Sequence, residues 1–108
     1  MANGEFDIFC RSVVGKKGWF PKMETSVELI DYTLSSGRGR CRIIRQTGED
    51  RKHCILHQDN VNLGIRACRD QGQLINTGEL IRAGIPSWQV SPLYGLLKLY
   101  FDQVGFSR

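Results

Sequence analysis

Residues 39–58 carry the pattern that most limits how this chain can fold. Two segments of alternating apolar and polar residues, 39–46 and 51–58, flank the turn-forming sequence Thr-Gly-Glu-Asp, and such a pattern is typical of a β-hairpin. With these four residues as the loop, Gln46 faces Arg51. Side chains alternate with period two along a strand, so any even-numbered loop sorts them in the same way. The apolar face then contains Cys41, Ile43, Cys54 and Leu56.

The opposite face of the predicted hairpin is basic. Its residues at alternating positions are Arg38, Arg40 and Arg42 on the first strand, with His53 and His57 on the second. Neighbouring cations destabilise a sheet unless an anion lies over them, and the planar guanidinium of Arg binds phosphate through paired hydrogen bonds. We therefore predict that this face binds nucleic acid, with RNA favoured over DNA because a flat basic sheet suits single-stranded or looped RNA. The predicted site extends to Lys16, Lys17, Arg45, Arg51 and Lys52, and the candidate stacking groups are Trp19, Phe20 and Trp88.

The overall charge agrees with this interpretation and also leaves an alternative open. Fifteen Lys and Arg residues against eleven Asp and Glu residues give a net charge of +4, and residues 11–52 hold most of the excess. The same arginines could instead be solvated edge charges that prevent sheets from aggregating. The chain lacks the aromatic motif of an RRM and the clamp of a KH domain. We therefore expect recognition through charge, with modest sequence preference.

Neither a metal site nor a catalytic centre is predicted. His53 and His57 would lie about 13 Å apart on a strand, whereas zinc ligands all lie within about 2.3 Å of the metal. The chain contains no GxSxG, P-loop, HExxH or GxGxxG motif. A small nuclease that uses one of these histidines as a general acid or base is the catalytic alternative, but the sequence identifies no third partner. We expect no cofactor.

The cysteines predict the redox environment. Cys10, Cys41, Cys54 and Cys68 form no CxxC pair, which argues against a zinc ribbon or a thioredoxin-like motif. The first residues lack a secretory signal, so we expect free thiols in a reducing, cytoplasmic environment. No apolar segment approaches the roughly 20 residues that a membrane-spanning helix needs, and no membrane partner is expected.

Elsewhere the chain predicts two more strands and a short helix. Residues 5–14 alternate well enough for a first strand. Residues 25–34 also fit a helix, but their β-branched and aromatic composition favours a strand. Residues 59–72 predict a helix that ends at Gly72, and residues 73–82 fit either a small hairpin or a continued helix.

The C-terminal segment predicts an amphipathic helix. Ser91 suits the cap, Pro92 the first helical position and Gly105 the exit. Between them, residues at helical spacing are Leu93, Leu96, Leu97, Tyr100, Phe101 and Val104. Additional apolar residues outside this stripe leave two alternatives: the helix packs across the sheet, or its second apolar side meets another copy of the chain in a homodimer. The interface candidates are Trp88, Tyr94 and Leu99.

Together these patterns predict a single α+β domain over residues 1–108, with an antiparallel sheet of four or five strands and the C-terminal amphipathic helix on one face. A basic hairpin followed by an apolar helix is similar in outline to small viral or phage proteins that package nucleic acid, over less than half of the chain.

The main prediction is a non-enzymatic RNA-binding protein. The alternative is a protein-interaction or self-assembling module, such as a viral structural or regulatory dimer. The predicted inner layer comprises Ile8, Cys10, Cys41, Ile43, Cys54, Leu56, Leu93, Leu97, Tyr100 and Phe101.

Overall fold

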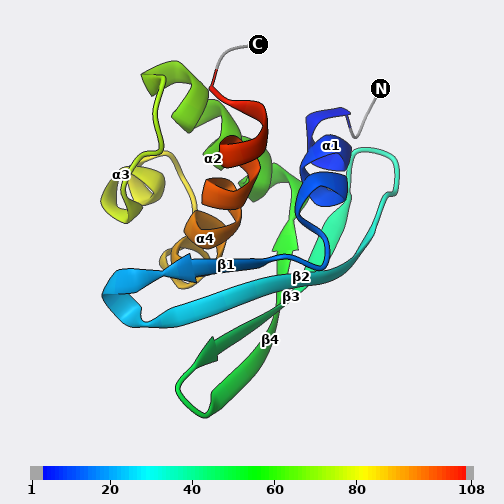
Figure 1. The fold of residues 1–108 in the computed structure, drawn as a ribbon. Helices are drawn as coiled ribbons and strands as arrows, with labels where there is room; N and C mark the ends of the chain where they lie inside the picture. Colours follow the sequence, from blue (N-terminus) through cyan, green and yellow to red (C-terminus); the bar gives the residue numbers. More distant parts are fainter. Residues whose placement is uncertain (1–3, 107–108) are drawn as a thin grey trace.

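A four-stranded antiparallel sheet with helices on one side forms the core of the protein (Figure 1). The computed structural model describes residues 4–106. The elements in chain order are α1 (Gly4–Val13), β1 (Lys17–Phe20), a 3-10 turn η1 (Pro21–Met23), β2 (Thr25–Thr33), β3 (Arg40–Thr47), β4 (Asp50–His57), α2 (Gln58–Gln71), α3 (Thr77–Arg82) and α4 (Ser87–Val104). The strands follow one another in the order β1-β2-β3-β4. This architecture confirms the predicted α+β class, with α4 packed on the sheet.

The β3–β4 hairpin has the predicted register. Gln46 lies opposite Arg51, Ile43 opposite Cys54 and Cys41 opposite Leu56. The pairing continues to Thr47 and Asp50, so the loop contains two residues rather than the predicted four. Gly48 adopts φ 59° there, a left-handed conformation that glycine enters without steric penalty. Because both loop lengths are even, every side chain lies on the predicted face.

The predicted strand over residues 25–34 is confirmed as β2, with one irregularity. Leu29 pairs with Ile43, but the next pair joins Asp31 to Arg42, so Ile30 is an extra residue in the strand. Such a β-bulge reverses the side on which the following residues point. As a result Asp31 lies on the same face of the sheet as Arg42.

The prediction of a strand over residues 5–14 is wrong, because this segment forms α1. Phe6, Phe9, Cys10 and Val13 are buried and recur at helical spacing, and the ring of Phe9 lies 5.4 Å from that of Tyr100 in α4. Ile8, predicted to be in the inner layer, is 45% exposed. The edge strand of the sheet is instead β1, in the segment that follows Gly15.

Helix α4 begins earlier than predicted. Ser87 is its first residue, and Pro92 lies inside the helix rather than at its start. The first turn of α4 is fixed to α2 by the buried Gln89, which accepts a hydrogen bond of 3.0 Å from Asn60. The predicted exit at Gly105 is confirmed, with φ 72°.

The crossing of α4 over β1 depends on two glycines. A Cβ built on Gly18 would lie 2.4 Å from the carbonyl oxygen of Gly95, and a Cβ on Gly95 would lie 2.6 Å from a methyl carbon of Val27. Real Cβ atoms do not approach so closely. The helix therefore sits directly on the backbone of the edge strand, and neither glycine can carry a side chain without displacing it.

Helices α2 and α3 lie on the same side of the sheet as α1 and α4 (Figure 1), where α2 packs against α1, α4 and β4, and α3 packs against α4. Helix α2 confirms the predicted helix, and Gly72 ends it with φ 67°. Residues 77–82 form the short helix α3 rather than a hairpin, because the Asn76 side chain caps it by accepting a hydrogen bond of 2.9 Å from the backbone N–H of Glu79. None of the helices in residues 4–106 combines the length and the apolar character needed to cross a bilayer.

Candidate nucleic-acid interface

The side of the sheet turned away from α1 and α4 presents most of the predicted basic residues, and we call it the open face. The helix-covered side buries residues such as Val27, Leu29, Cys41, Ile43 and Leu56. Residues that alternate with these form the open face: Lys17 and Trp19 in β1, Ser26, Glu28, Asp31 and Thr33 in β2, Arg40, Arg42, Ile44 and Gln46 in β3, and Arg51, His53, Ile55 and His57 in β4. From Arg40 to Gln46 this face is about 20 Å long.

The densest unpaired positive charge lies where the hairpin meets α2. Arg40 lies directly opposite His57, and Arg38 lies two residues before Arg40 in the chain. All three side chains are exposed, and none of them has an ion pair or a hydrogen-bond partner within residues 4–106. A cavity of about 280 Å³ opens here between Arg38 and His57, with Asp59 on its rim.

Arg42, the last arginine of the predicted row, is bound by the protein itself. Arg42 donates two hydrogen bonds to Asp31, at 2.7 Å from Nε to Oδ1 and 2.5 Å from Nη2 to Oδ2. The hydrogen bond from Arg42 lowers the pKa of the Asp31 carboxyl, and the pair leaves both side chains about half exposed. The sequence prediction did not place Asp31 beside Arg42, because the bulge at Ile30 is what moves the Asp31 side chain to the open face. Arg42 is consequently less available to an external phosphate than Arg38 and Arg40.

The far end of the open face combines aromatic, basic and acidic side chains. Trp19 is 48% exposed there, whereas Phe20, the other proposed stacking group in β1, is buried and packs against Tyr94 at 5.2 Å between ring centroids. Lys17 lies opposite Glu28, and Ser26 and Gln46 separate Trp19 from Arg51 across the sheet. The sequence prediction did not include Glu28. The pairing of β1 with β2 places Glu28 opposite Lys17, a predicted site residue, and this pairing is the signal that could have identified Glu28.

Three of the predicted basic residues lie elsewhere. Arg45 and Lys52 face each other in the register, on the side of the hairpin opposite the open face, where its tip extends away from the helices (Figure 1). Lys52 pairs with Asp50 at 3.6 Å. Lys16 donates a hydrogen bond of 3.1 Å to Gln103 of α4. The tip of the hairpin therefore carries basic groups on both of its sides.

The three residues predicted as a dimer interface have different environments. Trp88, in the first turn of α4, is 61% exposed. Tyr94 and Leu99 are only partly exposed, because both pack against the core. The structure does not bring these three side chains into one exposed patch.

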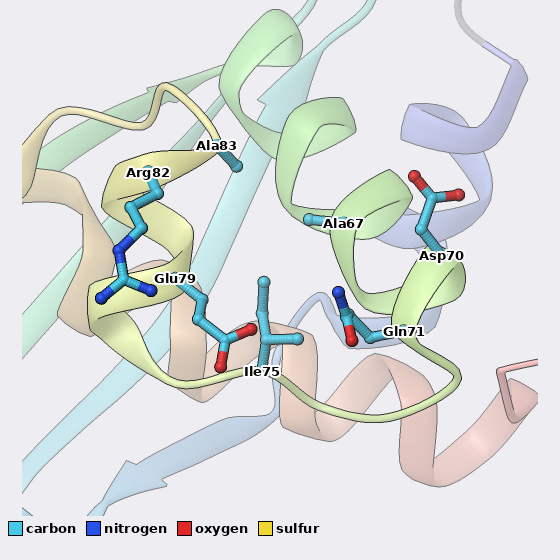
Figure 2. Close-up of a pocket in the computed structure, with 7 residues that line it drawn as sticks. All are labelled: Ala67, Asp70, Gln71, Ile75, Glu79, Arg82 and Ala83. Carbon is cyan, nitrogen blue, oxygen red and sulfur yellow. The ribbon is translucent and has the colours of Figure 1, made fainter.

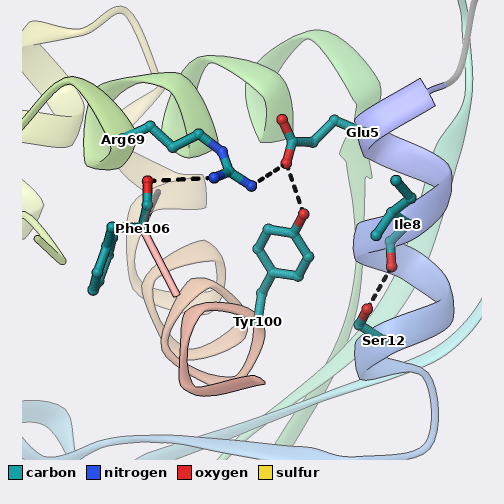
Figure 3. Close-up of polar contacts among 6 residues, drawn as sticks. All are labelled: Glu5, Ile8, Ser12, Arg69, Tyr100 and Phe106. Carbon is teal, nitrogen blue, oxygen red and sulfur yellow. Dashed lines mark hydrogen bonds and ion pairs between the residues drawn. The ribbon is translucent and has the colours of Figure 1, made fainter. Parts of the chain in front are cut away.

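A polar network joins the helices behind the sheet (Figure 3). Arg69 of α2 and the Tyr100 hydroxyl both donate to one carboxylate oxygen of Glu5 in α1, at 2.5 Å and 2.7 Å. Arg69 also donates to the carbonyl oxygen of Phe106. Burial, reinforced by the contact with Glu5, raises the pKa of Tyr100 to about 12. This network ties together segments from both ends of the chain and lies away from the open face.

The cysteines are free, as predicted, and are placed in the interior. Cys10, Cys41 and Cys68 are buried, and Cys54 is partly exposed. The hydrogen bond with Cys41, followed by burial, raises the pKa of the Cys10 thiol, and burial raises that of Cys68. Thiolates are the reactive form of cysteine, so we expect Cys10 and Cys68 to react slowly in the folded protein.

A second cavity, of about 320 Å³, lies between α2 and α3. Figure 2 shows Gln71 from α2 and Glu79 from α3 reaching toward Ile75. Glu79 also accepts a hydrogen bond of 3.2 Å from Asn76. No histidine, cysteine or serine lines this cavity, and it contains none of the predicted site residues. In the part of the chain that the structure describes, no group of three or more His, Cys, Asp or Glu side chains could hold a metal ion.

The open face gathers exposed basic, aromatic and apolar side chains on one surface, and it is our candidate for function. Comparisons with family models, with curated proteins and with solved structures return no match for this chain.

Proposed function

We propose that the open face binds single-stranded RNA through its phosphate groups, without catalysis. The observation that carries this proposal is the pair of unpaired arginines Arg38 and Arg40 near His57. Arg40 lies opposite His57 in the register, and Arg38 and His57 line a cavity of about 280 Å³. Guanidinium groups that lack an internal carboxylate partner bind phosphate oxygens with paired, charge-assisted hydrogen bonds. The exposed sheet surface from Arg40 to Gln46, about 20 Å long, offers room for an extended strand of several nucleotides.

The distribution of charge along the open face supports a path for the RNA. Arg38, Arg40 and Arg51 have no acidic partner within residues 4–106, whereas Asp31 neutralises Arg42 near the middle. Exposed Ile55 lies opposite Arg42 and offers an apolar contact between the two charged ends. Phosphates would therefore be held near the α2 end and near Arg51, with weaker electrostatic attraction between these positions.

The test is a salt titration of binding to a labelled oligouridine of eight nucleotides. For single strands, each neutralised phosphate contributes about −0.7 to the slope of log affinity against log salt. The double variant Arg38→Ala, Arg40→Ala should make this slope less negative by about 1.4 and weaken binding at low salt. The matched control, Arg66→Ala with Arg82→Ala, removes the same charge from exposed positions in α2 and α3. It should leave the slope almost unchanged.

Equal losses in the two double variants would mean that only net charge matters, and the proposed site would be wrong. Absence of any salt-dependent binding by the unmodified protein would remove the function altogether. The same titration with the oligodeoxyuridine of equal length compares RNA with DNA. We expect the RNA to bind more tightly, because its 2′-hydroxyl can donate to or accept from polar groups of the face.

Self-association is the second candidate, because Trp88 is 61% exposed at the start of α4. A large aromatic side chain in that position is typical of protein interfaces. Light scattering would detect a dimer, and Trp88→Ala should convert it to a monomer. A monomer in the unmodified protein at micromolar to millimolar concentration would exclude this candidate.

A further inference from the structure

One acidic side chain on the open face does not fit a surface that only attracts phosphate. Glu28 of β2 is partly buried, and within residues 4–106 it makes no ion pair or hydrogen bond. Lys17 lies opposite it in the register, but their charged groups are not within ion-pair distance. An unpaired carboxylate repels phosphates. Binding of the RNA phosphate backbone therefore does not explain why Glu28 lies on this face.

Glu28 lines a polar cavity in the sheet surface. This cavity has a volume of about 120 Å³, and it is formed by Lys17, Ser26, Glu28, Ile44, Gln46 and Arg51. Among these lining residues Ile44 is apolar, Glu28 offers two carboxylate oxygens as acceptors, and Lys17 and Arg51 are cationic donors. Gln46 directs one amide N–H to the carbonyl oxygen of Gly48 at 3.2 Å, and its own carbonyl oxygen remains a further acceptor. A small planar polar group fits this combination.

An exposed aromatic ring lies beside the cavity. Trp19 is 48% exposed and follows Lys17 by two residues in β1, on the same face. Because Trp19 pairs with Ser26, it is a diagonal neighbour of Glu28, and diagonal neighbours on an antiparallel pair lie about 7–8 Å apart. A nucleobase stacked on the indole can therefore extend its edge toward the carboxylate, since stacking on an aromatic ring is favourable for any base.

The hydrogen-bonding pattern of the cavity discriminates among the four bases. A carboxylate with two acceptor oxygens needs two adjacent N–H donors. Guanine presents such donors at N1 and N2, and its neighbouring O6 accepts from a cation such as Lys17. Adenine, cytosine and uracil place an acceptor next to their donor on the pairing edge, and that acceptor would face the carboxylate unfavourably.

We propose that the cavity beside Trp19 recognises a guanine base in single-stranded RNA, with the Glu28 carboxylate accepting from N1 and N2 of the base. This inference rests on the proposed RNA-binding function of the open face. It assigns a sequence preference to one nucleotide of a strand whose phosphates are held by arginines.

The experiment uses labelled octamers of uridine that carry one guanosine, adenosine or inosine at the fourth position. The guanosine octamer should bind about tenfold more tightly than the adenosine octamer, as a bidentate contact to a base edge implies. Inosine lacks the N2 amine and should bind with intermediate affinity. In a Trp88→Phe background, quenching of the Trp19 fluorescence reports stacking directly.

Glu28→Gln should abolish the preference for guanosine over adenosine and leave the affinity for plain oligouridine equal or slightly higher, because a negative charge is removed. That retained affinity also shows that the variant is folded. The control Glu49→Gln makes the same charge change at the exposed hairpin turn and should keep the preference. If the unmodified protein binds oligouridine but shows no guanosine preference, or if Glu28→Gln retains it, the cavity does not read guanine. If no octamer binds, the proposed function fails together with this inference.

Discussion

Replacing Gly18 by alanine is the most direct test of how α4 is seated on the sheet. The added Cβ would lie 2.4 Å from the carbonyl oxygen of Gly95 and 2.7 Å from its carbonyl carbon, whereas ordinary van der Waals contact begins at 3.4 Å. The two backbones must therefore separate by about 1 Å. Overpacking of a core costs typically about 1–3 kcal/mol. Because the obstructing atoms belong to a backbone and cannot rotate away, we expect a loss near the upper end, roughly 3 kcal/mol.

That loss is a large part of the roughly 5–15 kcal/mol that stabilises an ordinary domain. With a urea m-value of about 2 kcal/mol per M, the midpoint of unfolding should fall by roughly 1.5 M. Urea denaturation followed by circular dichroism measures it. The control is Gly4→Ala, where a Cβ meets no atom within 4 Å at the start of α1, and it should change the midpoint little or raise it. A free energy of unfolding for Gly18→Ala within about 0.5 kcal/mol of the Gly4→Ala value would refute this account of the crossing.

Three further outcomes follow from individual contacts. Asp31→Asn should release Arg42, raising the affinity for oligouridine and making the salt slope more negative by about 0.7; an unchanged slope would show that Arg42 does not reach the RNA. Because the pKa of Tyr100 is raised to about 12 from 10, its contribution to stability is complete below pH 10 and is lost as the pH rises from about 10 to about 12. Urea midpoints across that range should fall more steeply than those of Tyr100→Phe, and parallel curves would contradict the assignment. Thiol titration with a disulfide reagent should modify Cys54 first in the folded protein, since it alone among the cysteines is partly exposed. Equally rapid reaction of Cys10, Cys41 and Cys68 would contradict their burial.

The β3–β4 hairpin could be predicted from sequence in residue-level detail because its evidence is local. Both strands alternate, and a turn-forming segment separates them by an even number of residues. Period-two geometry then leaves one possible sorting of side chains, whichever even loop is used. The predicted pairing of Arg40 with His57, and of Cys41 with Leu56, is therefore the observed one.

Residues 5–14 could not be assigned by the same means because their pattern fits two periods. Phe6 and Cys10 would be buried whether the segment formed a strand or a helix. The two structures differ in that a strand buries Ile8, whereas a helix buries Phe9. Phe9 is buried because Tyr100, far away in sequence, packs against it. Tertiary packing thus decides the local conformation, and a single sequence does not contain that information.

The electrostatics of the open face also depended on information beyond local pattern. Without the bulge at Ile30, strict alternation would place Asp31 on the helix-covered side of β2, opposite Cys41. The extra residue moves it to the open face and beside Arg42. One irregular residue thereby changes a row of three free guanidinium groups into two free groups and one internal ion pair.

The contact between Glu5 and Tyr100 has a consequence for biosynthesis. These residues are 95 positions apart, and a ribosome that adds about 5–20 residues per second needs roughly 5–20 s to span them. During that interval the apolar side of α1 has no α4 to cover it, while the neighbouring strands β2, β3 and β4 can already pair. The nascent chain therefore leaves Phe9 without its Tyr100 partner until α4 has been made, and the docking of α4 completes the burial of α1.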